Sequence, residues 1–172
     1  MNNNEPTLYM PIGPSGCGKS TLFTQLQSVV DPLVCLSNDI MRCTLYEGDY
    51  KTCWAMSTAD KQFKNKVRQA YNEMLEQNIN IYIDNTNLSP KVRRYWLIEA
   101  KKKGYRTIAV LFNVDVDTLL TRQQARDDKT VPHSAVHEQQ AALKPPVDGE
   151  FDLVFNAAQF TTVVSLHIIE NS

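Results

Sequence analysis

The stretch GPSGCGKST, residues 13–21, has the pattern G-x-x-x-x-G-K-[ST] of a phosphate-binding loop. Its glycines let the backbone approach phosphate oxygens, and the amides that open the next helix point positive dipole at an anion. We expect the Lys19 ammonium to contact the outer phosphates and the Ser20 hydroxyl to hold Mg²⁺. The expected ligands are therefore Mg²⁺ and ATP or another nucleoside triphosphate. The predicted nucleotide-binding residues are Gly13, Pro14, Ser15, Gly16, Cys17, Gly18, Lys19, Ser20 and Thr21.

A carboxylate and a guanidinium follow in LSNDIMR, residues 36–42. Asp39 and Arg42 are three residues apart, so on a helical turn they share a face. An ionised aspartate near the terminal phosphate can orient an incoming hydroxyl and accept its proton. An arginine beside it can bind phosphate carried by the acceptor, because its planar fork matches phosphate oxygens. The competing interpretation is a helix N-cap at Asn38 or Asp39 followed by an ordinary surface arginine.

Asp84 opens DNTNLSP, residues 84–90, directly after an apolar stretch. A carboxylate at the end of a central strand can support the Mg²⁺ shell, directly or through water. No glutamate follows Asp84, which favours transfer to an acceptor over activation of water. The alternative for the same residues is a polar turn before a helix.

Arg122 and Arg126 lie four residues apart in TRQQARDDKT and would face the same way on a helix. Two guanidiniums on a lid, placed at about 122–132, could close over a triphosphate and stabilise the charge of the transition state. The alternative is a solvated helix surface.

Basic and aromatic residues near these segments suggest contact with nucleic acid. Lys91, Arg93 and Arg94 follow DNTN and could attract a phosphodiester backbone. Trp54, Tyr46 and Tyr50 lie after the Asp39 segment, where one ring could stack on a terminal base. Plain packing is the simpler interpretation for these three rings.

Alternating apolar stretches and amphipathic segments must position all of these residues. They predict strands at 7–13, 33–37, 79–83, 105–114 and 151–156, and helices at 19–29, 58–77, 90–103, 115–127 and 132–143. Such alternation indicates an α/β fold with a mainly parallel sheet of about five strands and helices on both faces. Ligands of such sheets bind at the carboxyl ends of the strands, where the residues above fall.

The 172 residues fit one domain, with a core at about 7–157 and a tail at 158–172, in which TTVVSLHII could add an edge strand. The formal charge of −1 excludes a protein that coats polyanions but leaves room for a local basic patch. No apolar run approaches the ~20 residues of a membrane span, and no secretory signal opens the chain. These features favour a cytoplasmic protein without membrane contact.

In this order and spacing, the motifs over residues 7–157 resemble the kinase module of the polynucleotide 5′-hydroxyl kinase family. The resemblance rests on GPSGCGKST, on Asn38, Asp39 and Arg42, and on IDNTNLSP at 83–90. It continues with the paired arginines ahead of Val131-Pro132 and with a late KPP…FDL segment. It implies a P-loop kinase-type three-layer sandwich.

The resemblance also implies roles for individual residues. Asp39 would be the general base, and Arg42 would hold the 3′-side phosphate of the acceptor. Lys19 and Arg126 would stabilise the transferring phosphoryl group, with Arg122 assisting on the donor and with Ser20 and Asp84 at the metal. This chain departs from the family in two places, because some relatives carry the acid where Asn85 stands, and members often show Asn-Arg-Asp where Ser37-Asn38-Asp39 stands.

The function that the resemblance implies is ATP-dependent transfer of the γ-phosphate to a 5′-OH end of DNA or RNA, in nucleic-acid repair. The sequence indicates no obligate protein partner. Two alternatives stay open from the residues alone. One is a P-loop kinase of a small-molecule alcohol, such as a sugar or nucleoside. The other is a non-catalytic nucleotide-binding switch.

Overall fold

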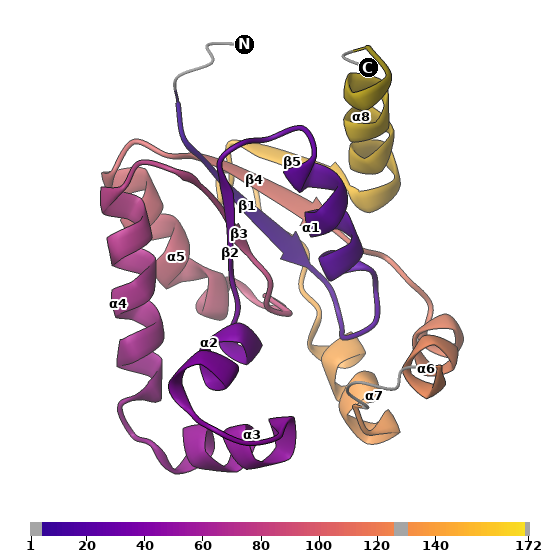
Figure 1. The fold of residues 1–172 in the computed structure, drawn as a ribbon. Helices are drawn as coiled ribbons and strands as arrows, with labels where there is room; N and C mark the ends of the chain where they lie inside the picture. The colour runs from indigo at the N-terminus through magenta and orange to yellow at the C-terminus, as the bar shows by residue number, and fades with distance from the viewer. Residues whose placement is uncertain (1–4, 126–130, 171–172) are drawn as a thin grey trace.

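The computed structural model describes residues 5–125 and 131–170 of the chain (Figure 1). In this described part, five parallel strands form one sheet in the order β2-β3-β1-β4-β5. Their bounds are Thr7–Ile12 for β1, Leu33–Leu36 for β2, Asn80–Ile83 for β3, Arg106–Leu111 for β4 and Leu153–Asn156 for β5. The predicted α/β fold with a parallel sheet of about five strands is therefore confirmed.

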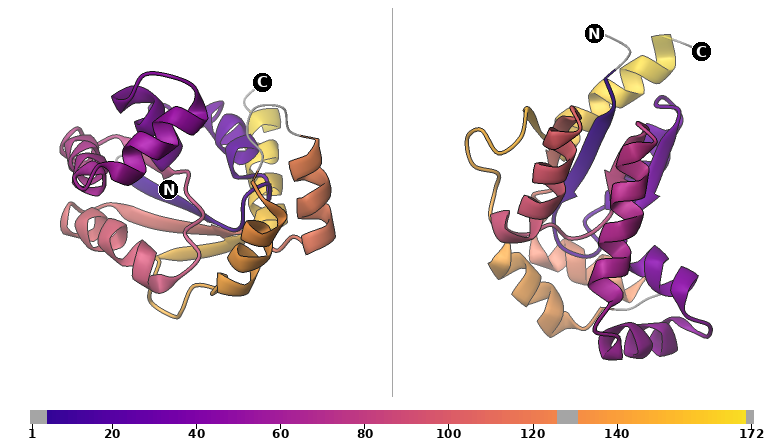
Figure 2. Two further views of the ribbon diagram at one scale, coloured as in Figure 1. Left: turned by 90° about the horizontal axis from the view of Figure 1, so that it is seen from below. Right: turned by 90° about the vertical axis from the view of Figure 1, so that its left-hand side faces the viewer.

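Helices cover both faces of the sheet, which gives three layers (Figure 1; Figure 2). Helices α4 and α5 pack on one face, and α1 and α8 pack on the other. The helices are α1 (Lys19–Gln27), α2 (Asn38–Leu45), α3 (Tyr50–Ala59), α4 (Phe63–Glu76), α5 (Pro90–Lys102), α6 (Val116–Gln124), α7 (His133–Ala142) and α8 (Ala157–Glu170).

Strand β1 lies at the centre of the sheet because all six of its residues are apolar or small enough to be buried on both faces. It pairs with β3 only as far as Tyr9, and with β4 along its whole length. Pro11, which has no N–H to donate, therefore lies beyond the end of the β3 pairing. The Pro11 carbonyl accepts instead from Asn87 Nδ2 at 2.8 Å. The Pro11 carbonyl therefore has a hydrogen-bond partner at the point where β1 leads into the phosphate loop.

One of the helix predictions was wrong. The segment 58–77 is not one helix, because Asp60 interrupts it between α3 and α4. The Asp60 carboxylate accepts from the Gln62 amide at 2.7 Å, from Tyr46 Oη at 2.6 Å and from Lys66 Nζ at 2.8 Å. A side chain that competes in this way for nearby amides favours a turn over a continuous helix.

The tail forms α8 and not an edge strand. Its β-branched residues suggested a strand, but Phe160 and Val164, four residues apart, are both buried in the core shared with α1. Burial of an i, i+4 pair against the sheet outweighs the weak strand preference of the local sequence.

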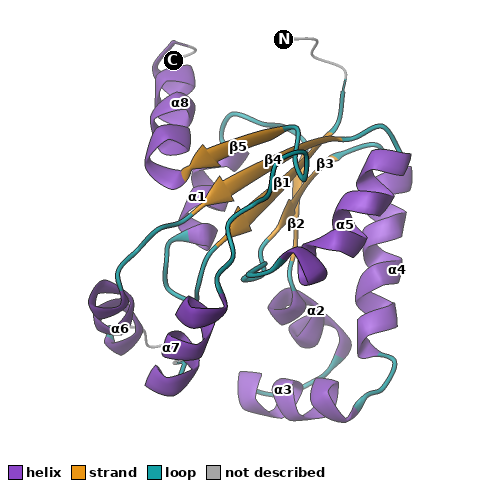
Figure 3. Cartoon of the chain, turned by 180° about the vertical axis from the view of Figure 1, so that it is seen from behind, coloured by secondary structure: helices purple, strands orange, loops and turns teal. Residues whose placement is uncertain are grey.

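At the carboxyl ends of the strands, two helical pairs flank the phosphate loop (Figure 1; Figure 3). Helices α2 and α3 contact each other on one side, and α6 and α7 contact each other on the other side. In the part of the chain that the structure describes, no helix is long and apolar enough to cross a membrane.

Candidate active site

The phosphate loop connects β1 to α1 and is built around a buried lysine. Gly18 caps α1 with φ 111°, a left-handed conformation that favours glycine. Lys19 is only 8% exposed, and its Nζ donates to the carbonyls of Gly13 at 3.0 Å and Pro14 at 2.7 Å. Tyr82 Oη from β3 donates to the Lys19 carbonyl at 2.7 Å. The ammonium therefore lies inside the curve of the loop.

Side chains of α6 and α7 fasten the same loop from one side. Gln139 Oε1 accepts from the Ser15 amide at 2.7 Å. Arg122 Nη1 donates to the carbonyls of Gly16 at 3.3 Å and Cys17 at 3.4 Å. The structure thus brings Arg122 to the phosphate loop, and its role toward a bound triphosphate stays a prediction. Arg126 lies outside the described residues.

Ser20 and Asp84 meet at the carboxyl end of β3. Ser20 Oγ donates to Asp84 Oδ2 at 2.8 Å, although the two residues are 64 positions apart. The Asp84 amide donates to the Leu36 carbonyl of β2 at 2.9 Å, which fixes the carboxylate beside α1. Within the described ranges no three Asp, Glu, His or Cys side chains cluster as a metal-binding group. A hydroxyl and a carboxylate suit Mg²⁺, which takes few protein oxygens together with water and phosphate.

Asp39 and Arg42 form an ion pair at the start of α2. The N-cap of this helix is Ser37, whose Oγ accepts from the Ile40 amide at 3.0 Å, so neither Asn38 nor Asp39 serves as the cap. Asp39 Oδ1 accepts from Arg42 Nη1 at 2.7 Å and from Tyr50 Oη at 2.8 Å. The Asp39 side chain is 41% exposed, so it remains open to solvent.

Arg42 is not an ordinary surface arginine, because only 12% of its side chain is exposed. Its Nε donates to Ser57 Oγ at 2.9 Å. Its guanidinium carbon lies 4.0 Å from the ring centroid of Trp54 and 5.3 Å from that of Phe63. Helix α3 and the start of α4 therefore fix the guanidinium in place, which sequence spacing alone did not reveal.

A hollow of about 350 Å³ lies beside the loop and is partly walled by α8. Cys17, Gly18 and Phe112 line it from the sheet side, and Arg122 and Thr161 line it from α6 and α8. Burial raises the pKa of the Cys17 thiol even though Lys19 lies next to it. Burial therefore makes the thiol harder to ionise than a free cysteine, which disfavours a role as a nucleophile.

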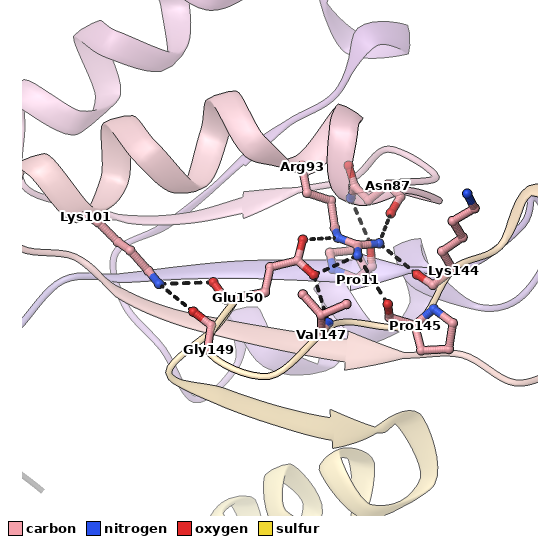
Figure 4. Close-up of polar contacts among 9 residues, drawn as sticks. All are labelled: Pro11, Asn87, Arg93, Lys101, Lys144, Pro145, Val147, Gly149 and Glu150. Carbon is pink, nitrogen blue, oxygen red and sulfur yellow. Dashed lines mark hydrogen bonds and ion pairs between the residues drawn. The ribbon is translucent and has the colours of Figure 1, made fainter.

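The DNTN segment has a structural task beside the phosphate loop (Figure 4). Asn87 is buried with φ 51°, and its Nδ2 donates to the carbonyls of Pro11, Ile83 and Asn85 at 2.8, 3.0 and 3.1 Å. The amide of Gly13 in the phosphate loop donates to the Thr86 carbonyl at 3.0 Å. This segment therefore supports the loop through backbone contacts.

Arg93 does not attract a nucleic-acid backbone, because it is completely buried. Its guanidinium binds both oxygens of Glu150, at 2.7 and 2.8 Å, and donates to the carbonyls of Asn87 and Lys144 at 3.0 Å each (Figure 4). The neighbouring Lys91 and Arg94 are exposed, which contact with a nucleic-acid backbone would require. The charge pattern could not separate the buried arginine from its exposed neighbours.

Sequence reasoning also missed the residues that orient the predicted ones. Tyr50 and Ser57 hold the Asp39–Arg42 pair, and Gln123 and Gln139 border the phosphate loop. The signal for Tyr50 was its nearness in sequence to Asp39. No sequence signal marked Gln139, which is 124 positions from the loop residue that it contacts.

Comparison with known proteins places these features in a family. A family profile described as "AAA domain" matches residues 8–146. A protein of Autographa californica nuclear polyhedrosis virus, named as a bifunctional polynucleotide kinase/RNA ligase, is 26% identical over 145 residues. That match covers 74% of this chain but only 20% of the viral protein. It supports the resemblance to polynucleotide kinases.

Solved structures share the fold at low identity. A chain of the Pnkp1/Rnl/Hen1 RNA repair complex matches with a TM-score of 0.66 and 22% identity, over 83% of this chain and 46% of that one. A gluconokinase from Sinorhizobium meliloti matches with a TM-score of 0.61 and 16% identity, over 96% of this chain and 90% of that one. This chain thus spans less than half of the first protein and nearly all of the second.

Proposed function

The chain belongs to the AAA domain family that its residues 8–146 match, and from that premise we propose that it is a polynucleotide 5′-hydroxyl kinase. It would transfer the γ-phosphate of ATP, or of another nucleoside triphosphate, to a 5′-OH end of DNA or RNA. Its biological setting would be nucleic-acid repair. The viral relative named as a polynucleotide kinase/RNA ligase supports this choice of acceptor.

One observation carries the proposal. An exposed carboxylate and a fixed guanidinium lie together at the carboxyl ends of the strands, on the side of the sheet where the phosphate loop also lies. Asp39 is 41% exposed, whereas Arg42 is held by Asp39, Ser57 and Trp54. Within the described residues, Arg42 Nη2 makes no hydrogen bond, so two N–H donors remain for an anion. An acceptor that carries both a hydroxyl and a phosphate matches this pair.

The proposed reaction is one in-line phosphoryl transfer. Asp39 accepts the proton of the 5′-hydroxyl as its oxygen attacks the γ-phosphorus. The bond from that oxygen to phosphorus forms, the bond from phosphorus to the bridging oxygen of the diphosphate breaks, and the nucleoside diphosphate leaves. Lys19 would move from the loop carbonyls to stabilise the negative charge on the phosphate oxygens.

The remaining roles follow from position. Arg122, already at the loop, would bind donor phosphates, and Arg126 is proposed for the same lid on its sequence spacing alone. Ser20 and Asp84 would hold Mg²⁺, which supplies positive charge that neutralises phosphate oxygens when it is bound. Asp84 fits this role at its present position, since its carboxylate already contacts the Ser20 hydroxyl.

The second candidate is a kinase of a small-molecule alcohol. The similarity to a gluconokinase over 96% of this chain and 90% of that one favours it. Such an acceptor would use Asp39 in the same way but would not need a phosphate at Arg42. The two candidates therefore differ in the acceptor, not in the donor.

The substitution Asp39→Asn tests the proposal. Asparagine cannot accept the proton, so transfer from labelled ATP to a short 5′-OH oligonucleotide should fall by about two to four orders of magnitude. Nucleotide affinity, measured by calorimetry, should stay within about threefold because Asp39 is assigned to the acceptor. The matched control is Asp49→Asn, since Asp49 only caps α3 and asparagine is an equally good cap.

Unchanged transfer by the Asp39→Asn variant would contradict the assigned role. The acceptor assignment is checked separately with the wild-type protein. It should phosphorylate a nucleoside 3′-phosphate in preference to the same nucleoside, and it should leave gluconate and other sugars unmodified. Transfer to a sugar alone would favour the second candidate.

A further inference from the structure

Trp54 is an aromatic side chain that the proposed reaction does not yet use. It lies on α3 and is 48% exposed, which is unusual for a ring of this size. The other tryptophan, Trp96, packs edge-on against Tyr71 and Tyr95 at centroid distances of 5.0 and 5.3 Å. The two tryptophans therefore differ, and only Trp54 offers a large aromatic surface to solvent.

One face of the Trp54 ring is already occupied. The Arg42 guanidinium lies over it at 4.0 Å, and Tyr50 contacts the ring in a tilted arrangement at a centroid distance of 6.1 Å. The exposed area of Trp54 must therefore belong to its other face and its edges. An aromatic face next to a fixed cation is the arrangement on which nucleobases stack in single-strand binding proteins.

Asp39, Arg42 and Trp54 follow one another in the same order as the hydroxyl, the phosphate and the base that they would contact in a nucleotide. Asp39 contacts Arg42 at 2.7 Å, and Arg42 contacts the Trp54 ring, so an acid, a cation and an aromatic ring follow one another. A 5′-hydroxyl, a 3′-phosphate and a nucleobase occur close together at the end of a polynucleotide. Exposed Ile40, at 47%, adds apolar surface on α2.

We infer that the open face of Trp54 is a stacking platform for a nucleobase at the 5′ end of the acceptor. This inference rests on the proposed function and narrows its substrate to acceptors with an unpaired terminal base. Trp54 is a positioning residue in this scheme, because it holds the acceptor and does not touch the transferring group. A small polar acceptor without a base would gain nothing from the open face.

The test compares Trp54→Ala with wild type on two matched oligonucleotides, one normal and one with its first two nucleotides abasic. Base–aromatic stacking predicts that the substitution lowers kcat/KM for the normal acceptor about 5- to 100-fold, mainly by raising KM. On the abasic acceptor the substitution removes only the contribution of Trp54 to holding Arg42, so the loss of kcat/KM should be at least about fivefold smaller than on the normal acceptor. Trp54→Phe, which keeps an aromatic face, should recover most of the activity.

Two results would overturn the inference. One is an equal loss on both acceptors, because it would mean that Trp54 acts only by orienting Arg42. The other is no loss on the normal acceptor. Met56→Ala is the control variant: Met56 is 45% exposed on the same helix but lies two positions on, so it faces elsewhere, and its activity should equal that of wild type.

Failure of the proposed function gives a different result. In that case the wild-type protein transfers no phosphate to either oligonucleotide. A direct binding measurement then decides the inference by itself. In a Trp96→Phe background, which leaves Trp54 as the fluorophore, a normal 5′-OH oligonucleotide should quench fluorescence and the abasic one should not. Equal quenching by both would overturn the stacking platform.

Discussion

At the scale of single residues, the site depends on contacts that fix a few side chains in unusual surroundings. Lys19 is buried with its ammonium on two loop carbonyls, and Arg42 is held between Asp39, Ser57 and the Trp54 ring. Each cation is therefore oriented before any ligand binds. Such preorganisation lowers the entropy that must be lost when a phosphate is positioned for reaction.

Gly16 shows how closely the loop is packed. Its φ is 85°, and a Cβ at this position would lie 2.6 Å from Gln123 Nε2. Gln123 is completely buried, and its Nε2 has no hydrogen-bond partner in the described part of the chain. A larger residue at Gly16 must therefore change the loop, since the neighbouring side chain has little room to move.

We expect Gly16→Ala to lower the free energy of unfolding by about 1–2 kcal/mol, the cost of a left-handed alanine. Displacement of the loop should also weaken ATP binding at least about tenfold, measured by calorimetry. Gly104→Ala is the matched control, because Gly104 has φ 75° but nothing within 4 Å of its added Cβ. That variant should lose similar stability and keep wild-type affinity, and equal affinities in the two variants would contradict the loop argument.

At the scale of elements, the segments that carry no chemistry position those that do. Helix α5 places Arg93 under the DNTN segment, where it joins Asn87, Lys144 and Glu150 (Figure 4). Asn87 in turn binds the Pro11 carbonyl at the end of β1. The turn before β5, the loop after β3 and the strand before the phosphate loop are thereby tied together.

We expect Glu150→Ala to be strongly destabilising, by about 3–5 kcal/mol, because it leaves the buried Arg93 charge without its partner. Urea unfolding measures this loss. The matched control is Glu99→Ala, which breaks the more exposed pair between Glu99 and Lys102 and should cost at most about 1 kcal/mol. Similar losses of unfolding free energy in both variants would show that the buried Arg93–Glu150 pair stabilises the fold no more than an exposed pair does.

The same pair predicts a dependence on pH. Burial acts to raise the pKa of Glu150, but the hydrogen bonds from Arg93 and Val147 and the Arg93 charge outweigh it, so the pKa is lowered. A lowered pKa stabilises the fold at pH values above the unfolded value of about 4.3, and this contribution is lost as the pH falls through the folded value. The stability gap between wild type and Glu150→Gln should therefore narrow below about pH 4. A gap that is constant from pH 7 to pH 3 would contradict the assigned shift.

At the scale of the whole molecule, the carboxyl ends of the strands bring together two helical pairs that lie far apart in the sequence. Helices α2 and α3 carry Asp39, Arg42 and Trp54 on one side, and α6 and α7 carry Arg122 and Gln139 on the other (Figure 1). The phosphate loop between them is bonded to the α6–α7 side through Ser15 and Gly16. In the proposed reaction, donor and acceptor would therefore be bound by separate helical pairs.

Binding of ATP with Mg²⁺ should therefore stabilise the chain as a whole. At a ligand concentration one hundred times Kd, the stabilisation should be about 2.7 kcal/mol, which raises Tm by roughly 5–10 °C for a chain of this size. Lys19→Ala should remove most of this shift, measured by differential scanning fluorimetry. Lys103→Ala, on an exposed surface ion pair, should keep it. The same shift in both variants would exclude Lys19 from the donor site.

The sequence by itself determined the architecture and the position of the phosphate loop, because both depend on local patterns. Alternating apolar and amphipathic segments predicted the parallel α/β fold, and GPSGCGKST predicted the loop that β1 and α1 form. Spacing also brought Asp39 and Arg42 onto one face, and the structure confirms that they touch. The roles assigned to these residues stay predictions.

Only the tertiary structure decided which similar residues are buried and which remain open. Arg93 and Arg94 are adjacent and chemically identical, yet one is fully buried against Glu150 and the other is exposed. Tyr50, Ser57 and Gln139 gain their places through contacts across helices and over as many as 124 positions. Such partners cannot be predicted from neighbouring residues in the sequence, because burial and long-range hydrogen bonds depend on how whole elements pack.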